Sequence, residues 1–239
     1  MLKEKCGQEN YKKLEKLAND KLMKFAAKYA ELFNPDSIFV RTDSRKDAER
    51  IRKTTLENKE ERPLVIEGHT AHFDGYFDQG RDKGSTRYLL RPDEVLGSDI
   101  MSVDREKGIE EIHKLFENAM KGKEMYICFY CLGPTGSKFS ISAVQITDSS
   151  YVAHSEDIRY RSGYEQFLNL KGSGNFFRFV HSAGELDRGV SKNFEKRHVY
   201  IDLQDEIVFS FNTQYAGNAV GLKKLAMRLA IKRASEEGW

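Results

Sequence analysis

The stretch from Phe211 to Lys224 combines residues suited to binding an anion. An apolar run ends at Phe211, a loop of small residues follows, and a helix pattern then begins with two adjacent lysines. Gly217 and Gly221 allow the backbone to approach a ligand closely, and the first N–H groups of a helix favour negative charge. Lys223 and Lys224 point about 100° apart on a helix, so they cannot make the same contact. A glycine turn before a solvated basic helix is the alternative interpretation of this spacing.

Two other groups contain cysteines or histidines, which commonly bind metals, but their spacing is not that of a complete metal site. Cys128 and Cys131 have the spacing of half a zinc site or of a redox pair. No second pair follows them, and in a strand they face opposite sides, which favours a role as buried small hydrophobes. The six histidines are scattered. His69 and His72 could place two ring nitrogens on one helix face, but nothing completes a ligand set. We therefore interpret all six as structural or loop histidines, with a minor role of His69 and His72 near a ligand as the alternative.

The elements that must position these residues alternate between helix and strand patterns. Apolar residues at helical spacing predict a helix from Glu9 to Phe33, and a polar helix is expected from Arg45 to Asn58. Strands are expected at 62–68, 124–131, 139–146 (half-buried), 175–181, 198–203 and 206–211, with an irregular stretch at 69–86 and a final helix from about Ala219 to Glu237. This order predicts a single α/β domain with a central mixed β-sheet flanked by helices.

Composition excludes several classes of protein. The chain has 239 residues and a net charge of +2, which lacks the basic footprint of a nucleic-acid-binding protein. No apolar run is long enough to span a membrane, and the first residues do not form a secretory signal. Three cysteines fit a reducing compartment. We therefore expect a cytoplasmic protein with neither nucleic-acid nor membrane partners.

Motifs in a consistent order along the chain resemble those of GTP-dependent phosphoenolpyruvate carboxykinase. Tyr215-Ala-Gly-Asn218 with Lys223-Lys224 is similar to the Tyr-Gly-Gly-Asn…Lys-Lys segment of that family. Further similar segments are Met120-Lys-Gly-Lys-Glu-Met-Tyr126, Gly133-Pro-Thr-Gly-Ser137, Thr147-Asp-Ser-Ser-Tyr-Val152 and Phe179-Val-His-Ser182. The resemblance implies a carboxy-lyase of gluconeogenesis that converts oxaloacetate and GTP to phosphoenolpyruvate, GDP and CO2. It also implies Mn2+ (or Mg2+) as cofactor.

The same resemblance implies roles for individual residues. Tyr215 would be a catalytic and substrate-binding residue that flanks the phosphoenolpyruvate or CO2 site. Gly217 would donate its backbone N–H to the substrate carboxylate, and Asn218 would also bind the substrate. Lys223 would act as a catalytic residue in the CO2 and substrate pocket. Lys224 would be a ligand of the metal that stabilises the enolate, which requires a neutral amine and therefore a lowered lysine pKa.

The resemblance also implies an arginine between Thr42 and Ile51 that binds the substrate carboxylates. A guanidinium suits this role because it can bind a carboxylate in a bidentate manner. Matching the Arg-Ile pair selects Arg50 but needs one inserted residue, whereas an ungapped match places Glu49 there. Arg52 stands where the family has a glutamate, and Ala216 replaces the first glycine of its motif.

The sequence contains no Gly-x-x-x-x-Gly-Lys-Ser/Thr loop to hold nucleotide phosphates. We therefore predict that residues 1–239 form the N-terminal domain of the enzyme and that GTP or GDP binds mainly to a C-terminal domain outside this chain. The isolated chain is expected not to turn over. The alternative is a stand-alone module that binds a carboxylate or serves in assembly.

Overall fold

The structure is a computed structural model. It describes residues 1–73, 75–78, 85–138, 140–187 and 189–214, and, beyond these, residues 225, 227, 228, 230, 231, 234, 235, 237 and 238. The α-helices are α1 (Leu2–Lys16), α2 (Asp20–Phe33), α3 (Arg45–Glu57), α4 (Arg105–Phe116), α5 (Ser150–Arg159) and α6 (Tyr164–Leu168). The short 3-10 helices are η1 (Tyr76–Asp78) and η2 (Phe194–Lys196).

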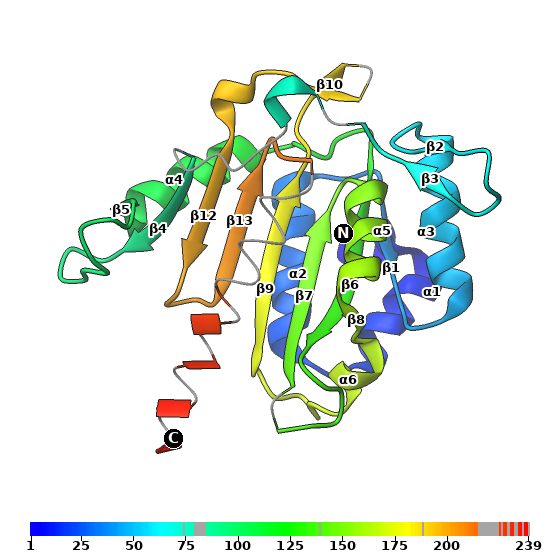
Figure 1. Ribbon diagram of the computed structural model, residues 1–239. Helices are drawn as coiled ribbons and strands as arrows, with labels where there is room; N and C mark the ends of the chain where they lie inside the picture. The colour runs from blue at the N-terminus through cyan, green and yellow to red at the C-terminus, as the bar shows by residue number, and fades with distance from the viewer. Residues whose placement is uncertain are drawn as a thin grey trace.

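The strands build one large mixed sheet, as predicted (Figure 1). Its order is β1-β6-β7-β9-β13-β12-β4-β5, with β8 paired to β6. The strands are β1 (Ser37–Val40), β4 (Thr86–Leu90), β5 (Ser102–Asp104), β6 (Glu124–Leu132), β7 (Ile141–Thr147), β8 (Arg161–Ser162), β9 (Phe176–Ser182), β12 (His198–Asp202) and β13 (Ile207–Phe211). Two small hairpins, β2 (Arg62–Pro63) with β3 (Thr70–Ala71) and β10 (Leu186–Asp187) with β11 (Val190–Ser191), lie outside it.

Alternation along the strands divides the core into two layers, one on each face of the sheet. On β6, Phe129 packs with α2, α4 and α6, whereas Tyr130 packs with α3 and α5 on the other face. Figure 1 shows α2 behind the sheet and α5 in front of it. Leu225, fully buried, joins the α3 and α5 side. Since both faces are covered, strand β7 is buried along its whole length, and the expectation of a half-buried strand is wrong.

Two further expectations are corrected. The helix expected from Glu9 to Phe33 is two helices, because Asn19 leaves the helical conformation (φ −127°, ψ 105°) and caps the N–H of Leu22. The strand expected over 62–68 is paired only at Arg62 and Pro63, and Val65 beyond it is fully exposed. The described residues of the final helix from 225 to 235 are helical. In the described part of the chain, no helix is both long and apolar enough to cross a bilayer.

Candidate substrate-binding edge of the sheet

Strand β13 directly precedes the predicted site residues in the sequence, and it ends at the edge where two further strands end. Strands β7, β9 and β13 are parallel, so their carboxyl ends meet, and antiparallel β6 begins at the same edge. In open α/β sheets, ligands bind beside the carboxyl ends of the strands. We call this region the polar edge, and its side chains come from Glu60, Asp78, Lys123, Glu124, Thr147, Asp148, His181, Ser182, Arg197, Thr213 and Gln214.

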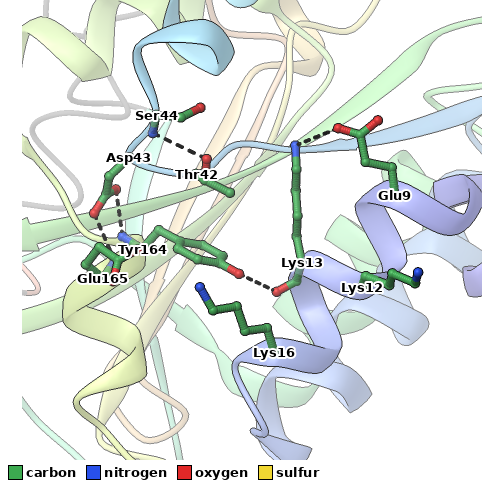
Figure 2. Close-up of a pocket in the computed structure, with 9 residues that line it drawn as sticks. All are labelled: Glu9, Lys12, Lys13, Lys16, Thr42, Asp43, Ser44, Tyr164 and Glu165. Carbon is green, nitrogen blue, oxygen red and sulfur yellow. Dashed lines mark hydrogen bonds and ion pairs between the residues drawn. The ribbon is translucent and has the colours of Figure 1, made fainter.

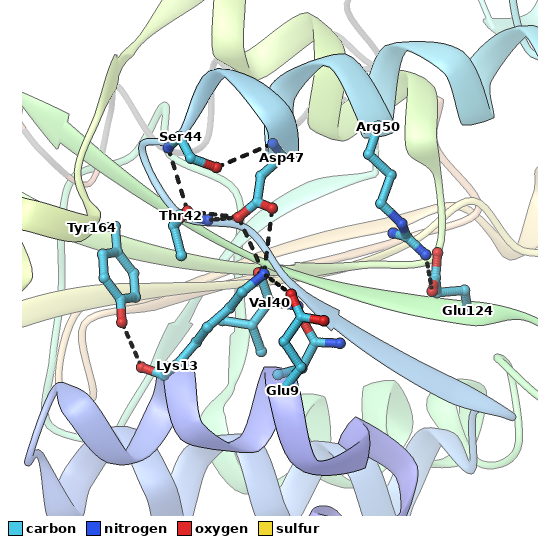
Figure 3. A network of polar contacts seen from close by, with 10 residues as sticks. Glu9, Lys13, Val40, Thr42, Ser44, Asp47, Arg50, Glu124 and Tyr164 are labelled. Atoms are coloured by element: carbon cyan, nitrogen blue, oxygen red, sulfur yellow. Dashed lines mark hydrogen bonds and ion pairs between the residues drawn. The ribbon is translucent and has the colours of Figure 1, made fainter.

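Helix α3 places Arg50 at this edge. The helix begins after β1 and runs back along it, so the guanidinium of Arg50 lies 2.9 Å from the carboxylate of Glu124 at the start of β6 (Figure 3). The guanidinium also lies over the ring of Phe39, 3.9 Å from its centroid. The side chain of Arg50 is 43% exposed, so a ligand can reach it.

An ion pair holds the start of α3, the end of the helix that lies away from Arg50. Lys13 on α1 binds Asp47 at 3.2 Å and the carbonyl of Val40 at 3.0 Å (Figure 3). Thr42 donates to the same carboxylate from its N–H at 2.9 Å and from its hydroxyl at 2.6 Å. Burial works to raise the pKa of Asp47, but these hydrogen bonds and the charge of Lys13 outweigh it and lower the pKa. The backbone that carries Arg50 is therefore anchored to β1 and α1.

A buried aspartate ties the end of β7 to the end of β9. The side chain of Asp148 is fully buried and accepts from Lys123 at 2.6 Å, from the hydroxyl of Ser182 at 2.9 Å and from the N–H of Ala183 at 2.7 Å. With these donors, the charge of Asp148 is satisfied within the protein. Asp148 thus positions the polar edge and is not available to a ligand.

His181 holds the backbone just before residues 215–224, the stretch that contains most of the predicted site residues. Its Nε2 lies 2.8 Å from the carbonyl of Thr213, which can only accept, so Nε2 carries the proton. Its Nδ1 therefore accepts from the hydroxyl of Thr147 at 2.6 Å. Burial lowers the pKa of His181, which keeps the ring neutral. Both ring nitrogens are used, so His181 positions the chain two residues before Tyr215.

A buried ion pair holds Gln214, the residue directly before residues 215–224. Arg197 binds Asp78 at 2.8 Å, and the side chain of Gln214 donates to Asp78 at 2.9 Å and to the carbonyl of Gly189 at 2.8 Å. Arg197 also donates to the carbonyl of Asn212 at 3.2 Å. These contacts join the irregular stretch 69–86 to the end of β13. Sequence reasoning missed Asp78 and Arg197, because neither belongs to a motif or a periodic element.

The first turn of α5 binds a carboxylate of the protein itself. Glu60 accepts from the hydroxyls of Ser149 (2.5 Å) and Ser150 (2.6 Å) and from the N–H of Tyr151 (2.9 Å). His72 stacks on Tyr151 with 3.6 Å between ring centroids and donates from Nδ1 to the carbonyl of Glu60. His72 therefore packs against α5, whereas His69 is exposed.

Most of the predicted site residues cannot be placed. Tyr215, Gly217, Asn218, Lys223 and Lys224 lie outside the described residues, and their predicted roles stay predictions. Arg50 is described and lies at the polar edge, as given above.

The described residues do not form a metal centre. Among them, no group of three or more histidine, cysteine, aspartate or glutamate residues could hold a metal ion. Cys128 and Cys131 are free and buried, as predicted. Burial raises the pKa of Cys128 to about 12. Arg52 donates to the carbonyl of Gly68, so it braces the loop after β2.

A cleft with three lysines lies away from Arg50. It measures about 620 Å³ and is lined by α1, by the start of α6 and by the residues after β1 (Figure 2). Its three lysines are matched by three carboxylates, and several of its polar groups already bind one another; the lining residues are Glu9, Lys12, Lys13, Lys16, Thr42, Asp43, Ser44, Tyr164 and Glu165. It lies where β1 ends, whereas Arg50 reaches the start of β6, so it is not part of the polar edge.

Comparison with known proteins identifies similar sequences. The profile of the family described as "Phosphoenolpyruvate carboxykinase N-terminal domain" matches residues 24–235. The chain is 54% identical over 239 residues to "Phosphoenolpyruvate carboxykinase [GTP]" of Thermococcus sibiricus and 52% identical over 239 residues to that of Thermococcus kodakarensis. It is 48% identical over 228 residues to that of Sulfurisphaera tokodaii. These matches cover 100%, 100% and 95% of this chain, but only 38%, 38% and 36% of the relatives.

Proposed function

This chain belongs to the phosphoenolpyruvate carboxykinase N-terminal domain family, and we propose that it is the substrate-binding part of a GTP-dependent phosphoenolpyruvate carboxykinase. The reaction is the conversion of oxaloacetate and GTP to phosphoenolpyruvate, GDP and CO2, a step of gluconeogenesis in the cytoplasm. The identity of 54% over the whole chain is the observation that supports it most. Since the chain spans 38% of that relative, we assign binding of GTP or GDP mainly to the remaining part.

Arg50 is the residue we propose to bind a carboxylate of oxaloacetate or phosphoenolpyruvate. In the structure its charge is balanced by Glu124 at 2.9 Å. A substrate carboxylate must therefore displace Glu124 or share the guanidinium, which offers donors along two edges. The ring of Phe39, 3.9 Å away, restricts how the guanidinium can turn. Glu124 thus keeps Arg50 oriented until the substrate provides a better bidentate partner.

The contacts that hold Thr213 and Gln214 support the roles proposed for the residues that follow them. Thr213 is bound by His181 and Gln214 by Asp78, so the backbone directly before Tyr215 is fixed in position. We assign the backbone N–H of Gly217 to the substrate carboxylate and Tyr215 and Asn218 to its surroundings. Preorganised donors stabilise developing charge because they need not reorient during the reaction.

We assign Lys223 to the pocket for CO2 and the reacting substrate, and Lys224 to a divalent metal, Mn2+ or Mg2+. Among the described residues, no group of three or more histidine, cysteine, aspartate or glutamate residues could hold a metal ion. We therefore assign at least part of the ligand set to residues outside them.

A chimeric enzyme tests the proposal. The matching segment of the Thermococcus sibiricus enzyme is replaced by this chain, and the formation of phosphoenolpyruvate from oxaloacetate and GTP is measured. We expect activity within about tenfold of the parent. A second chimera with the matching Thermococcus kodakarensis segment controls for damage at the junction.

The possible outcomes separate the proposal from its alternative. If the control chimera is active and the chimera with this chain is folded but inactive, the proposal is wrong. If, in addition, the chain by itself binds oxalate, it is a carboxylate-binding module. The isolated chain is expected not to convert oxaloacetate above the metal-only background, because groups that position the nucleotide phosphates are needed for phosphoryl transfer.

A further inference from the structure

A second cleft lies at the edge of the sheet opposite the polar edge. It measures about 400 Å³ and is bounded by α2, α4 and the starts of β9 and β13. Arg178 near the start of β9 is paired in register with Ile207 at the start of β13. Because parallel strands begin at one edge and end at the other, this cleft is separate from Arg50 and from Thr213 and Gln214 after the end of β13. We call it the α2–α4 cleft.

Four cationic side chains line the α2–α4 cleft. Lys21, Lys24 and Lys28 follow at helical spacing along one side of α2, and Arg178 lies opposite them on β9. The one acidic residue that lines the cleft is Asp205, and its carboxylate is bound by Arg105 at 2.7 Å. Within the described part of the chain, no carboxylate forms an ion pair with any of the four cations.

The charges of these groups act on one another inside the cleft. Burial lowers the pKa of Lys21, and the charge of Arg178 lowers it further. The pKa of Lys28 is lowered by the same two causes. Burial and the charge of Lys28 lower the pKa of His113 on α4. The charges of Asp205 and Glu206 act to raise the pKa of Lys21, and that of Asp205 acts to raise the pKa of Lys28, but both pKa values remain lowered. The net positive field of the cleft attracts negative ligands.

Two buried nitrogen atoms in this cleft have no hydrogen-bond partner among the described residues. They are Nε of Arg178 and Nε2 of His113. Arg178 uses another of its nitrogens to donate to the backbone carbonyl of Asp205. Buried polar groups in native proteins are normally satisfied, and an exception is explained by strain, by a functional role or by a water or ion.

The floor of the α2–α4 cleft is apolar and aromatic. It contains Phe25, Tyr29 and Phe209, and the guanidinium of Arg178 lies 5.8 Å from the ring centroid of Phe25. Lys28 lies 5.3 Å from the ring centroid of Tyr29. A cationic rim above an aromatic floor suits a ligand that combines several negative charges with a flat or apolar group.

We propose that the α2–α4 cleft binds a small molecule that carries a polyphosphate group, with phosphate oxygens against Lys21, Lys24, Lys28 and Arg178. Two sources share this chemistry, a free inorganic polyphosphate and a nucleoside triphosphate. The ring of a nucleoside triphosphate has a place on the aromatic floor, whereas a free polyphosphate uses the rim alone. This site is additional to the substrate edge and does not depend on the proposed reaction.

Calorimetric titration of the 239-residue chain tests the site, with sodium tripolyphosphate and with ATP as the probes, at low salt and without Mg2+. We expect both to bind, and more weakly as NaCl is added. Reversal of the rim charges in K24E/K28E is expected to weaken binding at least tenfold. The control is Lys46→Glu, which reverses the same charge at an exposed position of α3 outside the cleft. The affinity of this variant for each probe should stay within twofold of that of the unmodified chain.

The ring of His113 gives a readout at the cleft itself. A bound polyphosphate opposes the positive charges around His113, so NMR titration of this ring should show its pKa rise when the probe is added. Tighter binding of ATP than of tripolyphosphate supports contact with the floor, and equal binding supports a rim-only site. The proposal is overturned if neither probe binds below 10 mM, if K24E/K28E binds as well as the control, or if the His113 pKa does not move. Far-UV circular dichroism checks folding, and K24Q/K28Q replaces any variant that fails to fold.

Discussion

Removing Arg197 should strongly destabilise the fold, because it leaves a buried carboxylate without its cation. The side chain of Asp78 is 1% exposed and that of Arg197 is 9% exposed, and they are 2.8 Å apart. In Arg197→Met, the hydrogen bonds that Asp78 keeps from described residues are those from Gln214 at 2.9 Å and from the N–H of Ser191 at 3.1 Å. Breaking a buried pair from one side costs about 3–5 kcal/mol. We expect a loss of this size in the free energy of unfolding, measured by urea denaturation.

A double-mutant cycle separates the ion pair from the packing around it. In Arg197→Met/Asp78→Leu, both charges leave together, so the loss of stability should be smaller than the sum of the two single losses. The control is Arg45→Met, which removes an exposed partner of Glu49 on α3 and should change stability by less than about 0.5 kcal/mol. If Arg197→Met costs less than about 1 kcal/mol, or if the two losses simply add, the ion pair does not hold the end of β13 as argued.

Three further predictions concern the site, the anchor of α3 and the thiols. In the chimeric enzyme, Arg50→Ala should lower kcat/KM roughly 100-fold or more, because two charged hydrogen bonds to the substrate of about 1.5–3 kcal/mol each are lost. The control Arg45→Ala on the same helix should have little effect. Equal effects of the two substitutions in steady-state assays contradict the assignment of Arg50. Folding lowers the pKa of Asp47, so its contribution to stability is present above the ordinary pKa of 3.8 and is lost as the pH falls below that value. In urea denaturation from pH 6 to pH 2, the free energy of unfolding should therefore decrease less for Asp47→Asn than for the unmodified chain. Cys128 and Cys131 are buried, and burial raises the pKa of both thiols, so neither should react with a thiol reagent at pH 8 until the chain is unfolded; fast reaction of the folded chain would falsify this.

Local patterns predicted most of the elements, and the errors arose where packing decides. The helix expected from Arg45 to Asn58 is α3, and Ser44 caps its start, because this signal is contained within one turn. The apolar run Leu64-Val-Ile66 was expected in a strand but is exposed, since none of the described strands pairs with it. Strand β7 was expected to be half-buried, although helices cover both of its faces. Whether one or both faces of the sheet are covered depends on helices that are distant in the sequence, and the alternation of residues along one strand does not indicate them.

The sequence by itself determined the family, the mixed α/β class and Arg50 as a candidate for carboxylate binding, because motifs and periodicity are local properties of a chain. Only the tertiary structure decided that Arg50 pairs with Glu124, 74 residues away, at the edge where β13 ends. It alone joined Asp78 to Arg197, which are 119 residues apart and belong to no motif. Such pairs form because strand register brings distant side chains together and a buried charge requires a partner.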